Sequence, residues 1–164
     1  MIERLPLDDP RWSELSTFFE DGPTLAAGLS EWNRAIGFDQ EYDIYSQYVF
    51  NLILHQGTIT NAAFAVAPYL ADVCLNRRTD NLVEYLADIG WIEANRLTYG
   101  LYYNRSGTAE YPEWLMPPYH AAVAACVDLV DEVCDECTDT ERMEILLQMK
   151  PAFHGNGQKC WPQR

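Results

Sequence analysis

Basic residues are scarce in this sequence. Its 164 residues include 11 Lys and Arg against 25 Asp and Glu, which gives a formal net charge of −14. Nucleic-acid binding depends on a basic face that releases counterions, so no nucleic-acid partner is expected. Anionic membrane surfaces are disfavoured for the same reason. The charge favours a basic protein partner, although an acidic surface can also serve solubility alone.

Long apolar runs and an export signal are also missing. The first residues, Met1-Ile2-Glu3-Arg4-Leu5-Pro6, contain no basic stretch followed by an apolar core. No run reaches the roughly 20 apolar residues that a membrane-spanning helix needs. The five cysteines are odd in number. We therefore expect a cytoplasmic protein with reduced thiols and no membrane association.

The sequence lacks the common catalytic motifs. It has no P-loop, no glycine-rich dinucleotide turn, no Gly-x-Ser-x-Gly and no His-Glu-x-x-His. The three histidines, His55, His120 and His154, are isolated from an obvious nucleophile. His120 and Cys126 are six residues apart, which is poor spacing for contact on one helix. We therefore predict no catalytic residue and no cofactor.

Cys134 and Cys137 form a Cys-x-x-Cys motif. A zinc site would need two further ligands, for which His154 and Cys160 are the nearby candidates. Redox thiols of the thioredoxin type lie at a helix N-terminus, whereas this pair falls at an expected helix C-terminus among acids. We predict no metal site, and the sequence leaves any metal or redox role of the pair open.

What the sequence does contain is a strong helical pattern. Apolar residues make up 48% of the chain and aromatic residues 13%, which suits a folded core. Apolar spacings of three and four residues predict about seven antiparallel helices, and no segment alternates like a strand. We expect one all-α domain over residues 1–164, either an irregular bundle or a short stack of helical hairpins. Residues 153–164 are expected to form a loosely held tail.

Capping residues predict where the helices begin and end. Phe18, Phe19 and Leu147 are among the apolar positions assigned to helix stripes. Pro68 should kink the fourth helix, and Gly90 should weaken the fifth. The expected starts are Asp9-Pro10, Asp21-Gly22-Pro23, Asp39, Thr60, Thr79 or Asp80, Tyr119 and the capping box Thr138-Asp139-Thr140-Glu141, and the expected stops include Gly37, Gly57 and Pro151.

One segment resembles a known family. His55-Gln56-Gly57-Thr58 is followed by a run of small residues that ends in Val66-Ala67-Pro68-Tyr69-Leu70. This pattern, from roughly Leu52 to Asn76, resembles small bacterial HEAT-like helical proteins. Some of those proteins resemble immunity proteins of the polymorphic toxins delivered by secretion systems. The resemblance implies a HEAT-like hairpin stack and a toxin partner, although Tyr69 stands where many relatives have His.

The residues of this segment predict a joint between two helices. Gly57 can adopt the left-handed conformation that ends a helix, and His55 and Gln56 can bond to free carbonyls there. Thr58 or Thr60 can cap the following helix. A catalytic role for His55 is the alternative to this structural one.

The stretch from Tyr99 to Pro118 has the least regular pattern. It is expected to be a long ordered loop, and such loops are more often functional than short turns. Tyr and Trp among small flexible residues make effective binding surfaces, and acids beside them can pair with a basic partner. The alternative is that the loop folds onto the helices and hides its rings. The predicted partner-binding residues are Tyr99, Tyr102, Tyr103, Glu110, Tyr111, Glu113 and Trp114.

These observations favour an immunity protein that occludes the active site of a cognate toxin with an acidic, aromatic-rich surface. Toxins that act on nucleic acids or nucleotides often have the basic cleft that such a surface would fit. One alternative is a small helical enzyme or metal-binding protein that uses His55, His120 or the carboxylates. Another is a structural adaptor or homo-oligomer, which a large symmetric apolar interface would reveal.

Overall fold

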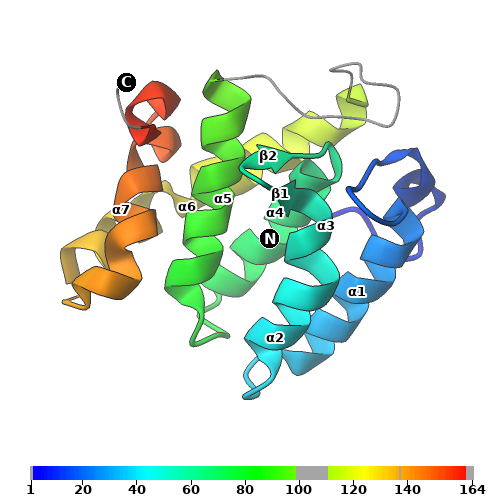
Figure 1. The fold of residues 1–164 in the computed structure, drawn as a ribbon, viewed down its shortest axis with the longest axis horizontal. Coiled ribbons are helices and arrows are strands. Elements are labelled where there is room, and N and C mark those ends of the chain that lie inside the picture. The colour runs from blue at the N-terminus through cyan, green and yellow to red at the C-terminus, as the bar shows by residue number, and fades with distance from the viewer. Residues whose placement is uncertain (1, 99–110, 137, 162–164) are drawn as a thin grey trace.

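The computed structural model describes residues 2–98, 111–136 and 138–161. Helices dominate these ranges, which confirms the predicted all-α class (Figure 1). None of these helices has both the length and the apolar composition needed to cross a bilayer. The α-helices are α1 (Gly22–Ala35), α2 (Glu41–Tyr45), α3 (Asn51–Ile53), α4 (Ala62–Leu75), α5 (Leu82–Thr98), α6 (Met116–Glu136) and α7 (Thr140–Phe153). The short helical turns are η1 (Pro10–Glu14), η2 (Ser46–Phe50), η3 (Glu113–Leu115) and η4 (Gly157–Cys160).

Helix α4 lies at the centre of the core. Twelve of its fourteen residues are buried, because its sequence is apolar on every side. Its many alanines occupy little space, and α5 and α6 both pack against it. Pro68 lies inside this helix, as predicted. Asp72 reaches the surface, where it binds Arg4 and Arg78.

Helices α5 and α7 come very close together at Gly90. A Cβ atom on Gly90 would lie 2.8 Å from the Cβ of Met149 and 2.8 Å from a ring carbon of Phe153. The sequence predicts Gly90 as a weak point in α5, and the structure adds a packing role. Figure 1 shows α7 beside α5 on the side of the molecule opposite α1.

The first expected helix is much shorter than predicted. Asp9 caps η1 as expected, by accepting a hydrogen bond from the Arg11 N–H. The helical turn ends at Glu14, and Phe19 is 61% exposed instead of lying on a helix stripe. Asp21 then caps α1 through the Thr24 N–H, also as predicted.

Contacts with distant residues replace the missing part of that first helix. The Ser16 N–H donates to the side chain of buried Asn61 at 2.7 Å. The Phe18 N–H donates to the Leu52 carbonyl at 3.0 Å. These backbone groups are therefore satisfied without a helix.

The third expected helix is present in three pieces. It begins after Gln40 instead of Asp39, and α2 passes into the π-helical turn η2 and then into α3. Tyr45 and Val49 are buried along its inner side. Tyr42 and Tyr48 remain exposed. The π-helical turn shifts the register of the side chains halfway along the segment.

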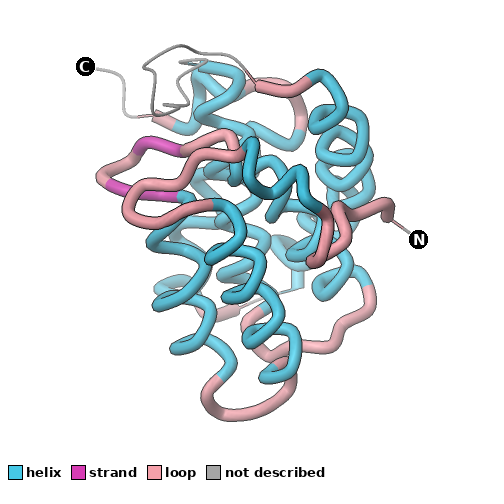
Figure 2. Tube along the Cα trace, turned by 90° about the vertical axis from the view of Figure 1, so that its right-hand side faces the viewer, coloured by secondary structure: helices cyan, strands magenta, loops and turns pink. Residues whose placement is uncertain are grey.

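The segment His55-Gln56-Gly57-Thr58 forms a β-hairpin between two helices. Strand β1 (Leu54–His55) pairs antiparallel with β2 (Thr58–Ile59), and His55 lies opposite Thr58. Gln56 and Gly57 have φ values of 50° and 81°. Two successive left-handed residues make the tight turn that reverses the chain. Figure 2 shows the hairpin at the edge of the helical body.

The predicted left-handed conformation of Gly57 is therefore confirmed, but its predicted role as a helix stop is wrong. The predicted caps are wrong as well. The Thr58 hydroxyl donates to the His55 carbonyl at 2.9 Å. The Thr60 hydroxyl is buried and has no hydrogen-bond partner among the described residues. Asn61 is the residue before α4.

Helix α6 begins before the predicted Tyr119, since Pro117 and Pro118 fit its first turn. Helix α7 begins within the predicted segment, but the cap is Asp139 instead of Thr138: the Asp139 side chain accepts from the Arg142 N–H. Pro151 does not stop α7. The helix ends two residues later at Phe153, and it is followed by His154 and by Gly155, which has a φ of 75°.

The C-terminal segment packs against the helices. Turn η4 contacts α5 and α7, and Cys160 is buried there. The Trp161 Nε1–H donates to the Thr98 hydroxyl at 3.1 Å, and the Trp161 ring meets the Trp91 ring edge-on at 5.6 Å. The prediction of a loosely held tail is therefore wrong for residues 153–161. Leu147, assigned to the α7 stripe, is exposed.

Replacing Gly90 with Ala should destabilise the protein. Ala favours a helix over Gly by about 1 kcal/mol. The added methyl group, however, must displace Met149 and Phe153, and overpacking of this kind costs about 1–3 kcal/mol. We expect Gly90→Ala to lower the urea midpoint without changing the m-value. A variant more stable than the wild type would contradict the close contact between α5 and α7.

Candidate protein-binding surface

Nearly all cations of the described residues are already neutralised by neighbouring acids. Nine Lys and Arg lie in these ranges, and eight of them form an ion pair with a carboxylate. Lys159 is the ninth, and the described ranges show no ion pair for it. The same ranges contain exposed carboxylates without an ion pair, including Asp39, Asp43, Glu113 and Asp128. Excess negative charge is therefore displayed to solvent.

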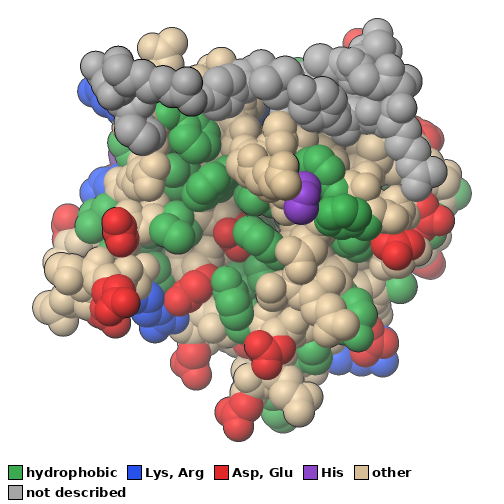
Figure 3. All heavy atoms as spheres, viewed as in Figure 1, with side chains coloured by type: hydrophobic (Ala, Val, Ile, Leu, Met, Phe, Trp, Pro, Cys, Tyr) green, Lys and Arg blue, Asp and Glu red, His purple; other side chains and the backbone are tan. Residues whose placement is uncertain are grey.

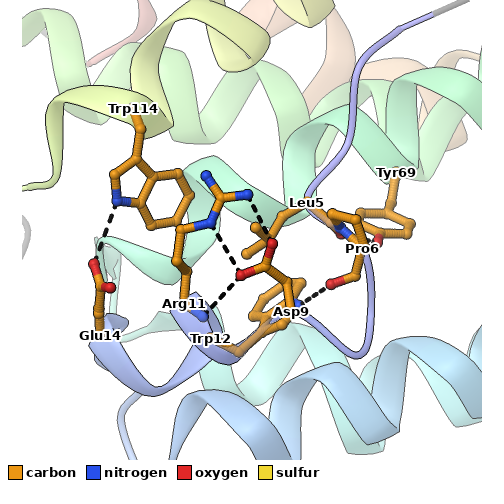
Figure 4. A network of polar contacts seen from close by, with 8 residues as sticks. All are labelled: Leu5, Pro6, Asp9, Arg11, Trp12, Glu14, Tyr69 and Trp114. Atoms are coloured by element: carbon orange, nitrogen blue, oxygen red, sulfur yellow. Dashed lines mark hydrogen bonds and ion pairs between the residues drawn. The ribbon is translucent and has the colours of Figure 1, made fainter.

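The predicted residue Trp114 lies at a corner formed with the N-terminal segment (Figure 4). Its indole Nε1–H donates to Glu14 at 3.3 Å, and the Arg11 guanidinium lies 4.8 Å from the ring centroid. Two hydrogen bonds of 3.0 and 2.7 Å join that guanidinium to Asp9. These bonds lower the pKa of Asp9 to about 2. The stacked arginine is therefore occupied within the chain.

The N-terminal segment crosses α4 beside this corner. Tyr69 donates its hydroxyl proton to the Leu5 carbonyl, and the Trp12 Nε1–H donates to the Pro6 carbonyl at 2.8 Å. Burial raises the pKa of Tyr69 to about 12. A pocket of about 240 Å³ lies between the segment and the start of α6, and proline and aromatic side chains form much of its wall.

The structure places three of the seven predicted partner-binding residues. Glu113 and Tyr111 are exposed, and Trp114 is half-buried. The Tyr111 ring packs edge-on against buried Phe64 at 5.8 Å. The remaining four lie outside the described residues: Tyr99, Tyr102, Tyr103 and Glu110.

Exposed aromatic rings gather on another part of the chain. Five Phe and Tyr side chains of the described residues are exposed, and four of them lie between residues 19 and 48. Phe38 is the most exposed, at 70%. Exposed rings of this size are unfavourable in water and are typical of interaction surfaces. The four are Phe19, Phe38, Tyr42 and Tyr48.

A buried carboxylate holds this region in place from beneath. Glu41 is only 2% exposed. Its carboxylate accepts hydrogen bonds from the Gly37 N–H at 2.7 Å, from the Tyr85 hydroxyl at 2.8 Å and from the Thr79 hydroxyl. The Tyr85 oxygen also accepts from the Trp32 Nε1–H at 2.9 Å. One carboxylate therefore joins α1, α2, α5 and the turn before α5.

Asp88 on α5 is a second inward-facing carboxylate, with far fewer donors. It is half-buried and accepts one hydrogen bond, from buried Tyr45 at 2.9 Å. The pKa of Asp88 is raised to about 7, mainly by burial. The Tyr45 hydrogen bond opposes this shift, and the charge of the nearby Glu84 adds to it. This carboxyl group is therefore partly protonated near neutral pH.

A third buried carboxylate, Glu93, joins α5 to α6. It binds Arg96 through two contacts of 2.7 Å and accepts from the Tyr119 hydroxyl at 2.5 Å. Burial raises the pKa of Tyr119 well above its usual value, and the Glu93 charge adds to this effect. Sequence analysis did not single out Glu41, Asp88 or Glu93, because each depends on donors from distant segments.

The histidines serve as packing or surface groups. His55 lies against Phe18 and Phe19, with ring centroids 5.6 and 5.0 Å away. His154 lies 3.2 Å from Asp131, which also binds Lys150 at 3.0 Å. Hydrogen bonds from Lys150 and His154 lower the pKa of Asp131.

The cysteines offer little reactivity in the described residues. Cys74, Cys126 and Cys160 are buried, and burial raises the pKa of all three. Cys134 is half-buried, and Cys137 lies outside the described residues. Within those residues, no three His, Cys, Asp or Glu side chains are grouped so that they could hold a metal ion.

Comparison of the chain with protein-family models, with curated proteins and with solved structures finds no match. The likeness to HEAT-like immunity proteins therefore stays a prediction from the segment around His55.

Removing the Glu41 carboxylate should be strongly destabilising. Glu41→Ala leaves three inward-facing donors without an acceptor, which should lower the free energy of unfolding by about 3 kcal/mol. Urea denaturation measures this loss. Glu31→Ala, at an exposed position of α1, is the control and should change stability by less than about 1 kcal/mol. Equal effects of the two substitutions would contradict the role assigned to Glu41.

Asp88 should make stability depend on pH. Its pKa is higher in the folded than in the unfolded protein, so its contribution is complete below pH 4 and is lost as pH rises to about 7. Asp88→Asn retains an acceptor for Tyr45 and removes the titration. We expect this variant to be more stable than wild type at pH 8, by about 2 kcal/mol, with the difference vanishing near pH 4.

Chemical denaturation at pH 4, 6 and 8 tests this expectation. Asp128→Asn, at an exposed position of α6, is the matched control and should give nearly the same difference at each pH. A constant gap between wild type and Asp88→Asn across that range would contradict the raised pKa.

Proposed function

We propose that this chain binds a basic protein partner. Specifically, we propose that it is an immunity protein that neutralises a bacterial toxin. The observation that carries the proposal is the pairing of eight of the nine described cations within the chain. Because those cations are neutralised, the remaining carboxylates present an acidic field to a partner. Exposed aromatic rings supply apolar contact area.

The mechanism is steric occlusion guided by charge. A negative surface speeds the encounter with a basic cleft and disfavours acidic competitors. After docking, aromatic side chains exclude water and fill apolar hollows of the partner. The toxin's active site or cofactor site is then covered, and no chemical step by the immunity protein is needed.

The arrangement of Glu41 and Glu93, two of the three inward-facing carboxylates, supports binding over catalysis. Glu41 and Glu93 are each held by donors from their own fold. Groups so occupied stabilise the scaffold and have little capacity left for a substrate proton. The surface features, by contrast, suit a macromolecular partner.

Co-expression with the product of the adjacent gene tests the proposal. We expect a complex that survives affinity purification and that restores growth when the neighbouring protein is toxic. The association rate constant should fall by about tenfold or more between 50 mM and 500 mM NaCl, because steering is screened by salt. An unrelated acidic protein of similar net charge is the control and should neither bind tightly nor rescue growth.

Absence of both binding and rescue would overturn the immunity assignment. A tight complex whose association rate is insensitive to salt would support the binding function. It would contradict the proposal that charge guides the encounter.

A further inference from the structure

The outer side of α2 and η2 forms a ridge, with polar side chains along its middle and aromatic side chains along its two sides. Tyr42, Asp43, Gln47 and Tyr48 are exposed along it, whereas Glu41, Tyr45 and Val49 face inward. Tyr42 stacks on Tyr85 of α5, with the ring centroids 6.5 Å apart. The Cβ of Tyr48 lies beside Gly28 of α1. The two rings therefore lie on opposite edges of the ridge, with Asp43 and Gln47 between them.

Phe38 stands at the beginning of this ridge, next to an open hollow. The hollow has a volume of about 480 Å³ and lies between the end of α1 and the start of α2. Its wall includes apolar Ala35, Phe38 and Ile44 together with the carboxylates of Glu31 and Asp39. Arg34 also lines it and is paired with Glu31 at 2.8 Å. An aromatic ring beside carboxylates is the environment that a cationic side chain prefers.

The exposed Phe38 is held by a rigid turn. Gly37 adopts a φ of 84°, and its N–H donates to the buried carboxylate of Glu41. The Phe38 N–H donates to the Ala35 carbonyl at 3.0 Å, and the Phe38 carbonyl accepts from the Glu41 N–H at 2.9 Å. A ring presented by a fixed backbone loses little conformational entropy when a partner covers it.

The distortion of the helix within the ridge also indicates a functional surface. The five residues Ser46–Phe50 are π-helical, and π-helical turns occur frequently at functional sites although they are rare elsewhere. This turn carries Tyr48 and keeps Val49 in the core. It therefore fits an exposed ring and a buried side chain into one short segment.

The charge around the ridge that is left without an ion pair is negative. Asp39 and Asp43 are exposed, and the described residues include no ion pair for either. Asp88 and Glu84 lie behind Tyr42, where their charges add to burial in raising the pKa of its hydroxyl. The cations of this region are paired with acids, Arg34 with Glu31 and Arg142 with Glu84. Figure 3 shows acidic side chains spread over this face, with apolar side chains between them.

We propose that the ridge of Phe38, Tyr42, Asp43, Gln47 and Tyr48 is the docking surface for a basic face of the protein partner, which places an Arg or Lys side chain in the hollow beside Phe38. The inference rests on the proposed function and assigns its contact to a surface that excludes Trp114. The partner's cation meets the Phe38 ring and the carboxylate of Asp39. Further cations of the partner meet Asp43.

Calorimetric titration of the purified adjacent-gene product with ridge variants tests this assignment. Phe38→Ala and Tyr48→Ala should each raise the Kd by about tenfold or more, as expected for aromatic side chains that a partner buries. Asp43→Lys should weaken binding most at low salt, since it reverses a charge. Ile145→Ala and Leu147→Ala are matched controls on α7, where the side chains are 51% and 49% exposed, and they should leave the Kd unchanged.

A second measurement separates binding from folding and locates the contact. Each variant should keep a urea midpoint close to that of wild type, because the substituted side chains are exposed. Amide hydrogen exchange in the wild-type complex should show new protection in residues 37–51.

Three outcomes decide the inference. Weakened binding by the ridge variants, with protection at residues 37–51, supports it. Wild-type Kd values for those variants, together with loss of binding in Trp114→Ala, would overturn the assignment of the ridge as the docking surface. The proposed function would remain supported. Failure of the wild-type protein to bind the adjacent-gene product would overturn both.

Discussion

The burial of α4 is the constraint on which the rest of the structure depends. A helix that is apolar on every side is stable only when other elements surround it. Helices α5 and α6 cover much of it, and polar side chains on this helix and just before it bind the N-terminal segment across the remaining side. These contacts join Asn61 to the Ser16 N–H, Tyr69 to the Leu5 carbonyl, and Asp72 to Arg4. One helix thus organises both the bundle and the segment before it.

Much of the fold follows from local rules in the sequence. The caps at Asp9 and Asp21 were predictable, because a carboxylate before a helix satisfies free N–H groups whatever the tertiary structure. The left-handed glycines Gly37 and Gly57 were predictable for a similar reason. The helical periodicity alone established the all-α class, since buried positions recur every three or four residues.

The remainder depends on partners that are distant in the chain. Gln56-Gly57 is a weaker turn signal than Asn-Gly, so the sequence favours a helix end at the position of the hairpin. The packing role of Gly90 appears only when Met149 is placed beside it. The candidate surface was predicted around Trp114 from composition, and sequence offers no means of telling which tyrosines stay exposed. The π-helical turn that exposes Tyr48 leaves no recognised sequence signal.

The Glu41 contacts separate the interior residues that hold the turn at Gly37 from the side chains that this turn exposes. Gly37, Thr79 and Tyr85 meet the carboxylate on the inside, whereas Phe38 and its neighbours point outward from a backbone already fixed. Substitutions on the outside can therefore accumulate without loss of the scaffold. Under the proposed function, changes in a few exposed side chains would alter which partner is bound, while the interior residues stay the same.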